Sequence, residues 1–211
     1  MDTASRIQLV VGLGNPGADY VLTRHNTGFW FVDALARNCG ASFSHERKFN
    51  GDVARVTING QDLRLLKPTT FMNASGQSVQ ALAQYLKLTP ESILVAHDDL
   101  DLPAGTVRLK RGGGHGGHNG LRDIIDHLGE DFLRLRFGIG RPADHHEIID
   151  FVLERPDAAD QEQIMQAVSA ALAALPGIVA GDLGRAMREL HNRGVVPRAR
   201  RGDALNSKTD P

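Results

Sequence analysis

The stretch IQLVVGLGNPGADYVLTRHNTGFWFVDALARNCG, residues 7–40, decides the fold class, because it reads as a strand, a loop and a helix in succession. The run IQLVV at its start is short, apolar and followed by glycine, which is typical of a buried strand. From residue 27 apolar side chains recur at helical spacing until Gly40 ends the pattern. These side chains are Phe29, Val32, Leu35 and Ala36. A strand followed by a helix is the repeating unit of an α/β fold.

The rest of the chain continues this alternation. Segments 51–60 and 61–68 alternate as two strands joined by Asn59 and Gly60, and Asn-Gly is a strong hairpin signal. Further strands are expected at 93–97, 106–110 and 134–140, and helices at 74–88, 121–128, 158–175 and 183–190. We therefore predict an α/β single domain with a twisted mixed β-sheet and helices on both faces. Ligands of such sheets gather at strand ends.

Length and composition set the remaining bounds. The chain has 211 residues, of which 41% are hydrophobic, enough for one sizeable core. Residues 195–211 are polar and lack periodicity, so we expect a poorly ordered tail. Cys39 is the single cysteine, which rules out an intrachain disulfide and fits a reducing cytoplasm. The first apolar run is too short for a signal peptide or a membrane span, which predicts a soluble cytoplasmic protein.

The net charge of -1 means that the whole molecule does not attract polyanions. A role on nucleic acid would need a local basic face. The segment 104–141 offers one, because it holds seven Lys or Arg against four Asp or Glu.

A dinucleotide-binding enzyme is the first alternative, since GLGNPG places Gly12, Gly14 and Gly17 in a G-x-G-x-x-G pattern after a strand. That fingerprint needs its helix to begin at the third glycine. Here Pro16 intervenes, and residues 18–26 show no helical stripe. A tight turn explains the glycines equally well, but it leaves Asn15 unexplained.

Several polar residues stand in loops where chemistry is possible. His25 precedes a helix, where it is either a surface or capping residue or a catalyst. Asp98 follows the end of a buried strand, where open α/β sheets place functional acids. Asn73 and Asn119 each precede a helix, and an N-cap is the ordinary role of such an asparagine.

A metallohydrolase is a second alternative, with His115 and His118 as ligands beside Asp98 or Asp101. No third ligand stands near the two histidines in sequence, and both lie in the glycine-rich segment RGGGHGGHNG, residues 111–120. This segment is followed directly by a patterned helix, so we interpret it as a shaped loop rather than a linker. The chain lacks a Walker lysine and a G-x-S-x-G elbow, which favours water as the nucleophile.

Four long motifs together resemble the bacterial peptidyl-tRNA hydrolase family. They are VGLGNPGADYVLTRHNTGFWFVD at 11–33, KPTTFMNASG at 67–76, HDDLDLPAGTVRLKRGGGHGGHNGLRDI at 97–124 and LRFGIGRP at 135–142. The resemblance extends from about Ile7 to about His191 and implies a catalytic domain over residues 1–194. It also implies a monomeric, metal-free enzyme without a cofactor that hydrolyses the ester between peptide and tRNA.

The resemblance assigns roles by position. His25 becomes the general base and Asp98 its partner. Six residues become contacts of the substrate and water: Asn15, Tyr20, Phe71, Met72, Asn73 and Asn119. Arg108 and Lys110 become the cations that bind the tRNA 5′-phosphate. These roles agree with general acid–base chemistry, because a neutral imidazole held by a carboxylate is a base near working pH.

A binding module on the same fold remains the rival to an enzyme, because relatives in chloroplast intron splicing use this scaffold without evident hydrolysis. Peptidyl-tRNA would be the partner in either case. The full set of His25, Asp98, Asn15, Asn73 and Asn119 favours the enzyme.

Overall fold

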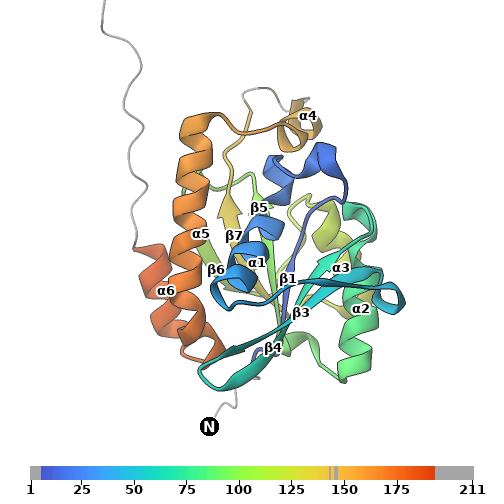
Figure 1. The fold of residues 1–211 in the computed structure, drawn as a ribbon. Coiled ribbons are helices and arrows are strands. Elements are labelled where there is room, and N and C mark those ends of the chain that lie inside the picture. The colour runs from blue at the N-terminus through green and yellow to red at the C-terminus, as the bar shows by residue number, and fades with distance from the viewer. Residues whose placement is uncertain (1–5, 143, 145–146, 193–211) are drawn as a thin grey trace, which may run out of the picture.

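The computed structural model describes residues 6–142, 144 and 147–192. These residues form one domain around a seven-stranded mixed sheet with the strand order β2-β3-β4-β1-β5-β7-β6 (Figure 1). The strands are β1 (Leu9–Gly12), β2 (Ser44–Glu46), β3 (Gly51–Ile58), β4 (Gln61–Pro68), β5 (Ile93–Asp99), β6 (Val107–Arg111) and β7 (Leu133–Gly138). The central strands β4, β1, β5 and β7 are parallel, and the strands at both edges are antiparallel.

Six α-helices and five short 3₁₀ turns connect these strands within the described ranges. The helices are α1 (Thr27–Asn38), α2 (Ser75–Leu86), α3 (Asn119–Leu128), α4 (Ile148–Leu153), α5 (Ala158–Val179) and α6 (Leu183–His191). The 3₁₀ turns are η1 (Ala18–Tyr20), η2 (Arg24–Asn26), η3 (Arg47–Phe49), η4 (Met72–Ala74) and η5 (Pro90–Ser92).

The sheet separates two hydrophobic cores, as the prediction of helices on both faces requires. Helices α1, α5 and α6 cover one face, and α2 and α3 cover the other (Figure 1). Along β1, Val10 faces the first core while Leu9 and Val11 face the second, because side chains alternate across a strand. Burial on both faces explains why Leu9, Val10 and Val11 are all apolar, whereas Gln8, just before the strand, is exposed.

The hairpin prediction is confirmed. β3 and β4 pair antiparallel, with Ile58 opposite Gln61. Asn59 and Gly60 both have positive φ angles, 52° and 76°, as a two-residue turn of this type needs.

Three elements differ from the prediction. β2 is a short exposed edge strand without apolar alternation, and α4 is a helix of six residues, so neither gave a periodic signal. Helix α5 continues past Pro176 to Val179, although the prediction ended it at residue 175. Ile178 and Val179 are buried in the first core, and this packing holds the last turn in place.

By length and composition, helix α5 is long and apolar enough to cross a membrane, but half of its apolar 18-residue stretch is buried in the protein. Its buried side chains belong to the first core, as expected for a core helix. The predicted tail at 195–211, and with it the boundary at residue 194, lies outside the described residues.

Candidate active site

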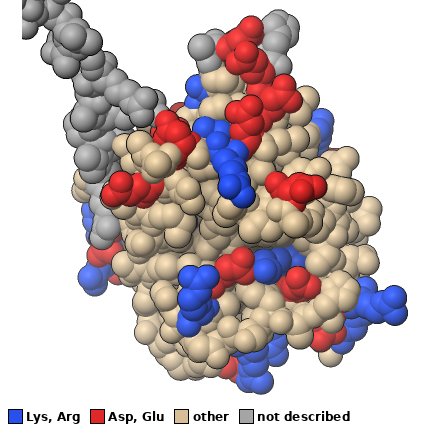
Figure 2. All heavy atoms as spheres, turned by 45° about the horizontal axis from the view of Figure 1, so that its top comes forward, with Lys and Arg blue, Asp and Glu red and all other residues tan. Residues whose placement is uncertain are grey.

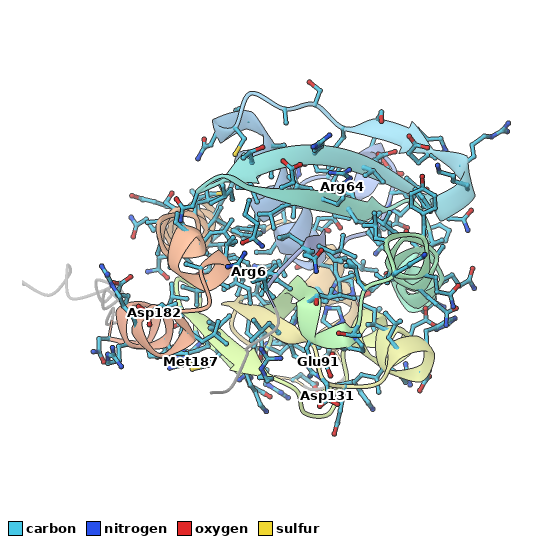
Figure 3. The ribbon with its side chains drawn as sticks, turned by 90° about the horizontal axis from the view of Figure 1, so that it is seen from below. Arg6, Arg64, Glu91, Asp131, Asp182 and Met187 are labelled. Atoms are coloured by element: carbon cyan, nitrogen blue, oxygen red, sulfur yellow. The ribbon has the colours of Figure 1, made fainter. Side chains whose placement is uncertain are left out.

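A pocket of about 710 Å³ lies at the carboxyl end of β5, and the loops that follow β1 and β4 also line it. Its walls hold nine of the ten site residues predicted from the sequence: Asn15, Tyr20, His25, Phe71, Met72, Asn73, Asp98, Lys110 and Asn119. The tenth, Arg108, does not line it. The opposite end of the sheet carries the labelled Arg64 and Glu91, near the starts of β1 and β5 (Figure 3).

Close packing of α1 on β1 fixes the position of His25. A Cβ atom on Gly12 would lie 2.3 Å from the carbonyl oxygen of Gly28, and one on Gly28 would lie 2.3 Å from the carbonyl oxygen of Ala96. Only glycine fits both positions, so α1 can begin directly at the edge of the sheet. Gly12 of GLGNPG thus serves helix packing, and the helix begins at Thr27 rather than at the third glycine.

His25 and Asp98 meet in the pocket from segments 73 residues apart. Nδ1 of His25 lies 2.9 Å and 3.0 Å from the two carboxylate oxygens of Asp98. Both side chains are buried. An ionised carboxylate accepts, so Nδ1 carries the proton, and Nε2 is left with a lone pair. Among the described residues Nε2 has no hydrogen-bond partner, so it is available to a substrate water.

His118 is a second histidine on the same carboxylate, which the sequence had suggested only as a metal ligand. Its Nε2 lies 3.0 Å from Oδ1 of Asp98. Its Nδ1 accepts hydrogen bonds from the backbone N–H groups of Gly120 and Leu121, at 3.1 Å and 3.3 Å. An accepting Nδ1 carries no proton, so Nε2 of His118 is the donor to Asp98.

These contacts shift the protonation equilibria in opposite directions. Burial alone would lower the pKa of His25, but the charge of Asp98 and the hydrogen bond to it outweigh burial and raise that pKa. Burial opposes ionisation of Asp98 too, yet His25 and His118 hold its pKa well below the usual range. Asp98 is therefore a carboxylate at neutral pH.

His97 contacts the backbone of Asp98. Its Nδ1 donates to the backbone carbonyl of Asp98 over 2.7 Å, and its ring is 2% exposed. Burial, aided by the nearby His118, lowers the pKa of His97 to about 3. The ring is therefore neutral and adds no positive charge beside Asp98.

Asn15 is held by three hydrogen bonds that leave its amide nitrogen available. Its Oδ1 accepts from the backbone N–H of Met72 at 2.8 Å. The side chain of Asn26 binds both backbone groups of Asn15, at 2.8 Å and 3.0 Å. Among the described residues, Nδ2 of Asn15 has no partner. Asn26 is thus a positioning residue that the sequence did not single out.

The capping roles considered for Asn73 and Asn119 are wrong. Asn73 lies inside η4, and Ala74 is the N-cap residue of α2. Asn119 is the first residue of α3, and the N-cap is His118. The Oδ1 of Asn119, a residue that lines the pocket, accepts from Arg122, and its NH₂ group has no partner among the described residues. Both asparagines are therefore free of capping duty.

Apolar side chains form the outer part of the pocket. Tyr20 and Phe71 meet edge to face, with ring centroids 6.4 Å apart, and Phe71 is 60% exposed. Helix α4, absent from the sequence prediction, adds Ile148, Ile149, Val152 and Leu153. The run IIDFVL at 148–153 was the available signal, but it is too short to reveal its periodicity.

The glycine-rich loop forms another wall. Gly116 and Gly117 have φ angles of 57° and 84°, and added Cβ atoms there would meet no neighbour within 4 Å. Glycine is thus needed for backbone conformation, and it leaves the loop surface open to a large ligand. Buried Arg134 holds the loop by donating to the carbonyl oxygens of Gly113 and Gly114. Arg134 is not among the site residues predicted from the sequence.

The two predicted phosphate contacts are separated by the fold. Lys110 is exposed and lines the pocket. The guanidinium of Arg108 instead donates to the carbonyl oxygen of Leu190 at the end of α6, 3.3 Å away. Arg136, which is not among the predicted site residues, also lines the pocket and pairs with Asp99 at 2.7 Å.

The ligand set considered for a metal is altered by the fold. His118 meets Asp98 and His25, with ligand atoms within 4.8 Å of one another, whereas Asp101 pairs with Arg141 and Nδ1 of His115 accepts from the backbone of Gly117. The proton on Nε2 of His118 points at Asp98 because Nδ1 is engaged in capping α3. A neutral imidazole binds metal through an unprotonated nitrogen, so Nε2 of His118 offers no lone pair to a metal ion in this tautomer.

Comparisons with known proteins agree on one family. A family model described as "Peptidyl-tRNA hydrolase" matches residues 9–198. The chain is 53% identical to a peptidyl-tRNA hydrolase of Neisseria meningitidis and 55% identical to one of Pseudomonas putida, covering 90% and 89% of this chain and 100% and 97% of those proteins. It is similar to the crystal structure of peptidyl-tRNA hydrolase from Acinetobacter baumannii, with a TM-score of 0.88 and 46% identity over 91% of this chain and 98% of that one.

Proposed function

The chain belongs to the peptidyl-tRNA hydrolase family, and from this membership we propose that His25 activates the water that cleaves the ester between peptide and tRNA. The observation that carries the proposal is the contact between Nδ1 of His25 and the carboxylate of Asp98 at 2.9 Å. Asp98 fixes the tautomer in which Nε2 faces the pocket and stabilises the imidazolium that forms.

The reaction then proceeds in two proton transfers. Nε2 of His25 takes a proton from water while the oxygen attacks the ester carbonyl, and the tetrahedral intermediate forms. The imidazolium returns the proton to the leaving ribose oxygen, and the carbon–oxygen ester bond breaks. The products are a peptide with a free carboxylate and a deacylated tRNA.

The three asparagines supply hydrogen bonds to the substrate in this proposal. The free Nδ2 of Asn15 and the NH₂ of Asn119 are suited to stabilise a developing oxyanion. Asn73, beside them on the pocket wall, offers both a donor and an acceptor to an amide of the peptide. Reading the peptide amide separates peptidyl-tRNA from aminoacyl-tRNA, whose free amine is charged.

The outer pocket receives the rest of the substrate. Tyr20, Phe71 and Met72 line the channel for the peptide, and Lys110 contacts the tRNA 5′-phosphate. Arg108 also contributes to binding this phosphate, but less than Lys110, because its guanidinium donates to the carbonyl oxygen of Leu190. We further infer a cytoplasmic monomer that needs neither membrane nor metal, supported by its one cysteine and by the donor set around His118.

The test is hydrolysis of diacetyl-lysyl-tRNA by the purified protein, with and without EDTA. We expect full activity in EDTA and a loss of about 10²- to 10⁴-fold in His25→Ala, the usual contribution of a general base. Binding of tRNA should survive, because His25 lies in a turn outside both main cores.

His45→Ala is the matched control. His45 pairs with Asp52 at the same 2.9 Å, but the pair is exposed on β2 and β3, away from the pocket. Near wild-type turnover by His25→Ala would refute the assignment. Tight tRNA binding without any hydrolysis by the wild type would favour a binding module, and activity restored by zinc after chelation would favour a metallohydrolase.

A further inference from the structure

Arg24 is a buried arginine directly before His25, and it does not line the pocket. Its side chain is 8% exposed, and its Nη2 forms a long ion pair with Oδ2 of Asp160 at 3.9 Å. Burying a guanidinium is costly unless its donors are matched. The other partners of this side chain are therefore informative.

Those partners are the carbonyl oxygens at the end of α4. Nη1 of Arg24 lies 3.2 Å from the oxygen of Phe151, 3.5 Å from that of Glu154 and 3.1 Å from that of Arg155. The backbone N–H of Arg24 donates to the carbonyl of Glu154 as well, at 3.1 Å. The last carbonyls of a helix lack partners inside the helix and form its negative end, so a cation satisfies them well.

The ring of Phe151 completes the contact. The guanidinium carbon of Arg24 lies 4.1 Å from the centre of this ring. A planar guanidinium can stack on a ring and donate from its edge at the same time, and an ammonium group cannot. Lysine would therefore reproduce only part of this arrangement.

Helix α4 needs such an anchor. It has six residues, too few for a helix that is stable by itself, and its inner side packs on η2 and on a small core with Val152 and Ile164. Its other side chains face the pocket or solvent, and Ile149 is 71% exposed. The position of α4 thus depends on contacts at its carboxyl end.

We propose that Arg24 is a positioning residue that fixes α4 as the apolar wall of the pocket and thereby sets how tightly the peptide part of the substrate binds. The second half rests on the proposed function. The wall consists of aliphatic side chains, which match apolar residues of a peptide rather than the phosphates of tRNA. His25 keeps its own support, because Asp98 holds its ring independently of α4.

The test compares wild type, Arg24→Met and Arg24→Lys. Amide hydrogen exchange is measured across the protein, and kcat and KM are measured on a peptidyl-tRNA with an apolar peptide and on one with a glycine peptide. In Arg24→Met we expect faster exchange in α4 and a rise of about ten-fold in KM for the apolar peptide, the change expected when charge-assisted hydrogen bonds are lost. KM for the glycine peptide and the acidic limb of the kcat profile should change little.

Arg24→Lys should give intermediate values, and it decides the question if Arg24→Met does not fold. Leu63→Ala is the control for general destabilisation, since Leu63 is fully buried in β4 and contacts the first core rather than α4. It should leave the KM ratio of the two substrates unchanged.

Unchanged α4 exchange and an unchanged KM ratio in Arg24→Met would overturn the proposal. A KM ratio in Leu63→Ala that rises as much as in Arg24→Met would overturn it too, as would Arg24→Lys identical to wild type. If the wild type hydrolyses neither substrate, the proposed function fails, while hydrogen exchange still decides whether Arg24 positions α4.

Discussion

Asp98 accepts hydrogen bonds from two histidines whose protons are fixed by different means. His118 donates through Nε2 because its Nδ1 is occupied by the backbone N–H groups at the start of α3. His25 donates through Nδ1, which leaves its Nε2 as the one basic ring nitrogen of the pair turned to the pocket. A carboxylate with two donors stays ionised, so it favours the imidazolium form of His25.

Replacing Asp98 by asparagine tests this arrangement. The raised pKa of His25 depends on the carboxylate charge, so the acidic limb of the kcat profile should move to lower pH in Asp98→Asn. We also expect kcat to fall more than about ten-fold, because an amide can present a donor where an acceptor is needed. KM should change little. The measurement is kcat against pH on peptidyl-tRNA.

Asp52→Asn is the control for this experiment, since Asp52 also binds a histidine but is far from the pocket. A limb that moves to higher pH in Asp98→Asn would contradict the assignment of the carboxylate.

One side chain at the start of α3 both caps the helix and contacts the carboxylate of Asp98. Helix α3 uses a histidine as its N-cap residue, and the same ring reaches Asp98 on β5. The cap therefore links a helix on one face of the sheet to the end of a central strand.

Two substitutions of His118 separate these duties. In His118→Ala the cap is lost, and we expect unfolding to be easier by about 0.5 to 2 kcal/mol. In His118→Asn the side-chain oxygen can still cap α3, but asparagine is too short to hold Asp98. Both variants should lose kcat to a similar extent, while only His118→Ala loses stability. Urea unfolding and kcat are the measurements, and wild-type kcat in His118→Asn would show that the bond to Asp98 is unimportant.

The net charge of the protein does not explain an affinity for RNA. The net charge is -1, and Figure 2 shows acidic and basic side chains mixed over the face that it displays. Attraction for a polyanion must therefore come from a few cations near the pocket, and each phosphate contact made by one of them adds to the salt dependence of binding.

Lys110 and Arg108 are expected to differ in this respect. A plot of log affinity against log salt has a negative slope. Lys110→Ala should make this slope less steep by about 0.7 to 0.9, the effect of one lost phosphate contact. It should also raise KM for peptidyl-tRNA more than for a minimal ester without the 5′-phosphate. Arg108→Ala should have a smaller effect on both, because Leu190 engages the guanidinium. Arg185→Ala on α6 is the control, and equal effects on both ester substrates would assign Lys110 to the fold instead.

Sequence patterns predicted the fold class, the hairpin at Asn59 and Gly60, and the order of all strands and helices except β2 and α4, because periodicity and turn residues are local properties. Through its resemblance to a family the sequence also selected nine residues that share one pocket. Their roles in binding and catalysis stay predictions.

Only the tertiary structure decided which groups meet. His118 contacts Asp98, Arg108 contacts Leu190, and Arg24 contacts the end of α4. Each of these contacts joins segments that are far apart in the chain. Local patterns report the face on which a side chain lies, whereas a hydrogen bond depends on distances set by how helices pack on the sheet. For that reason the sequence suggested His118 only as a metal ligand in a glycine-rich loop. In the folded protein His118 caps α3 and donates to the carboxylate of Asp98.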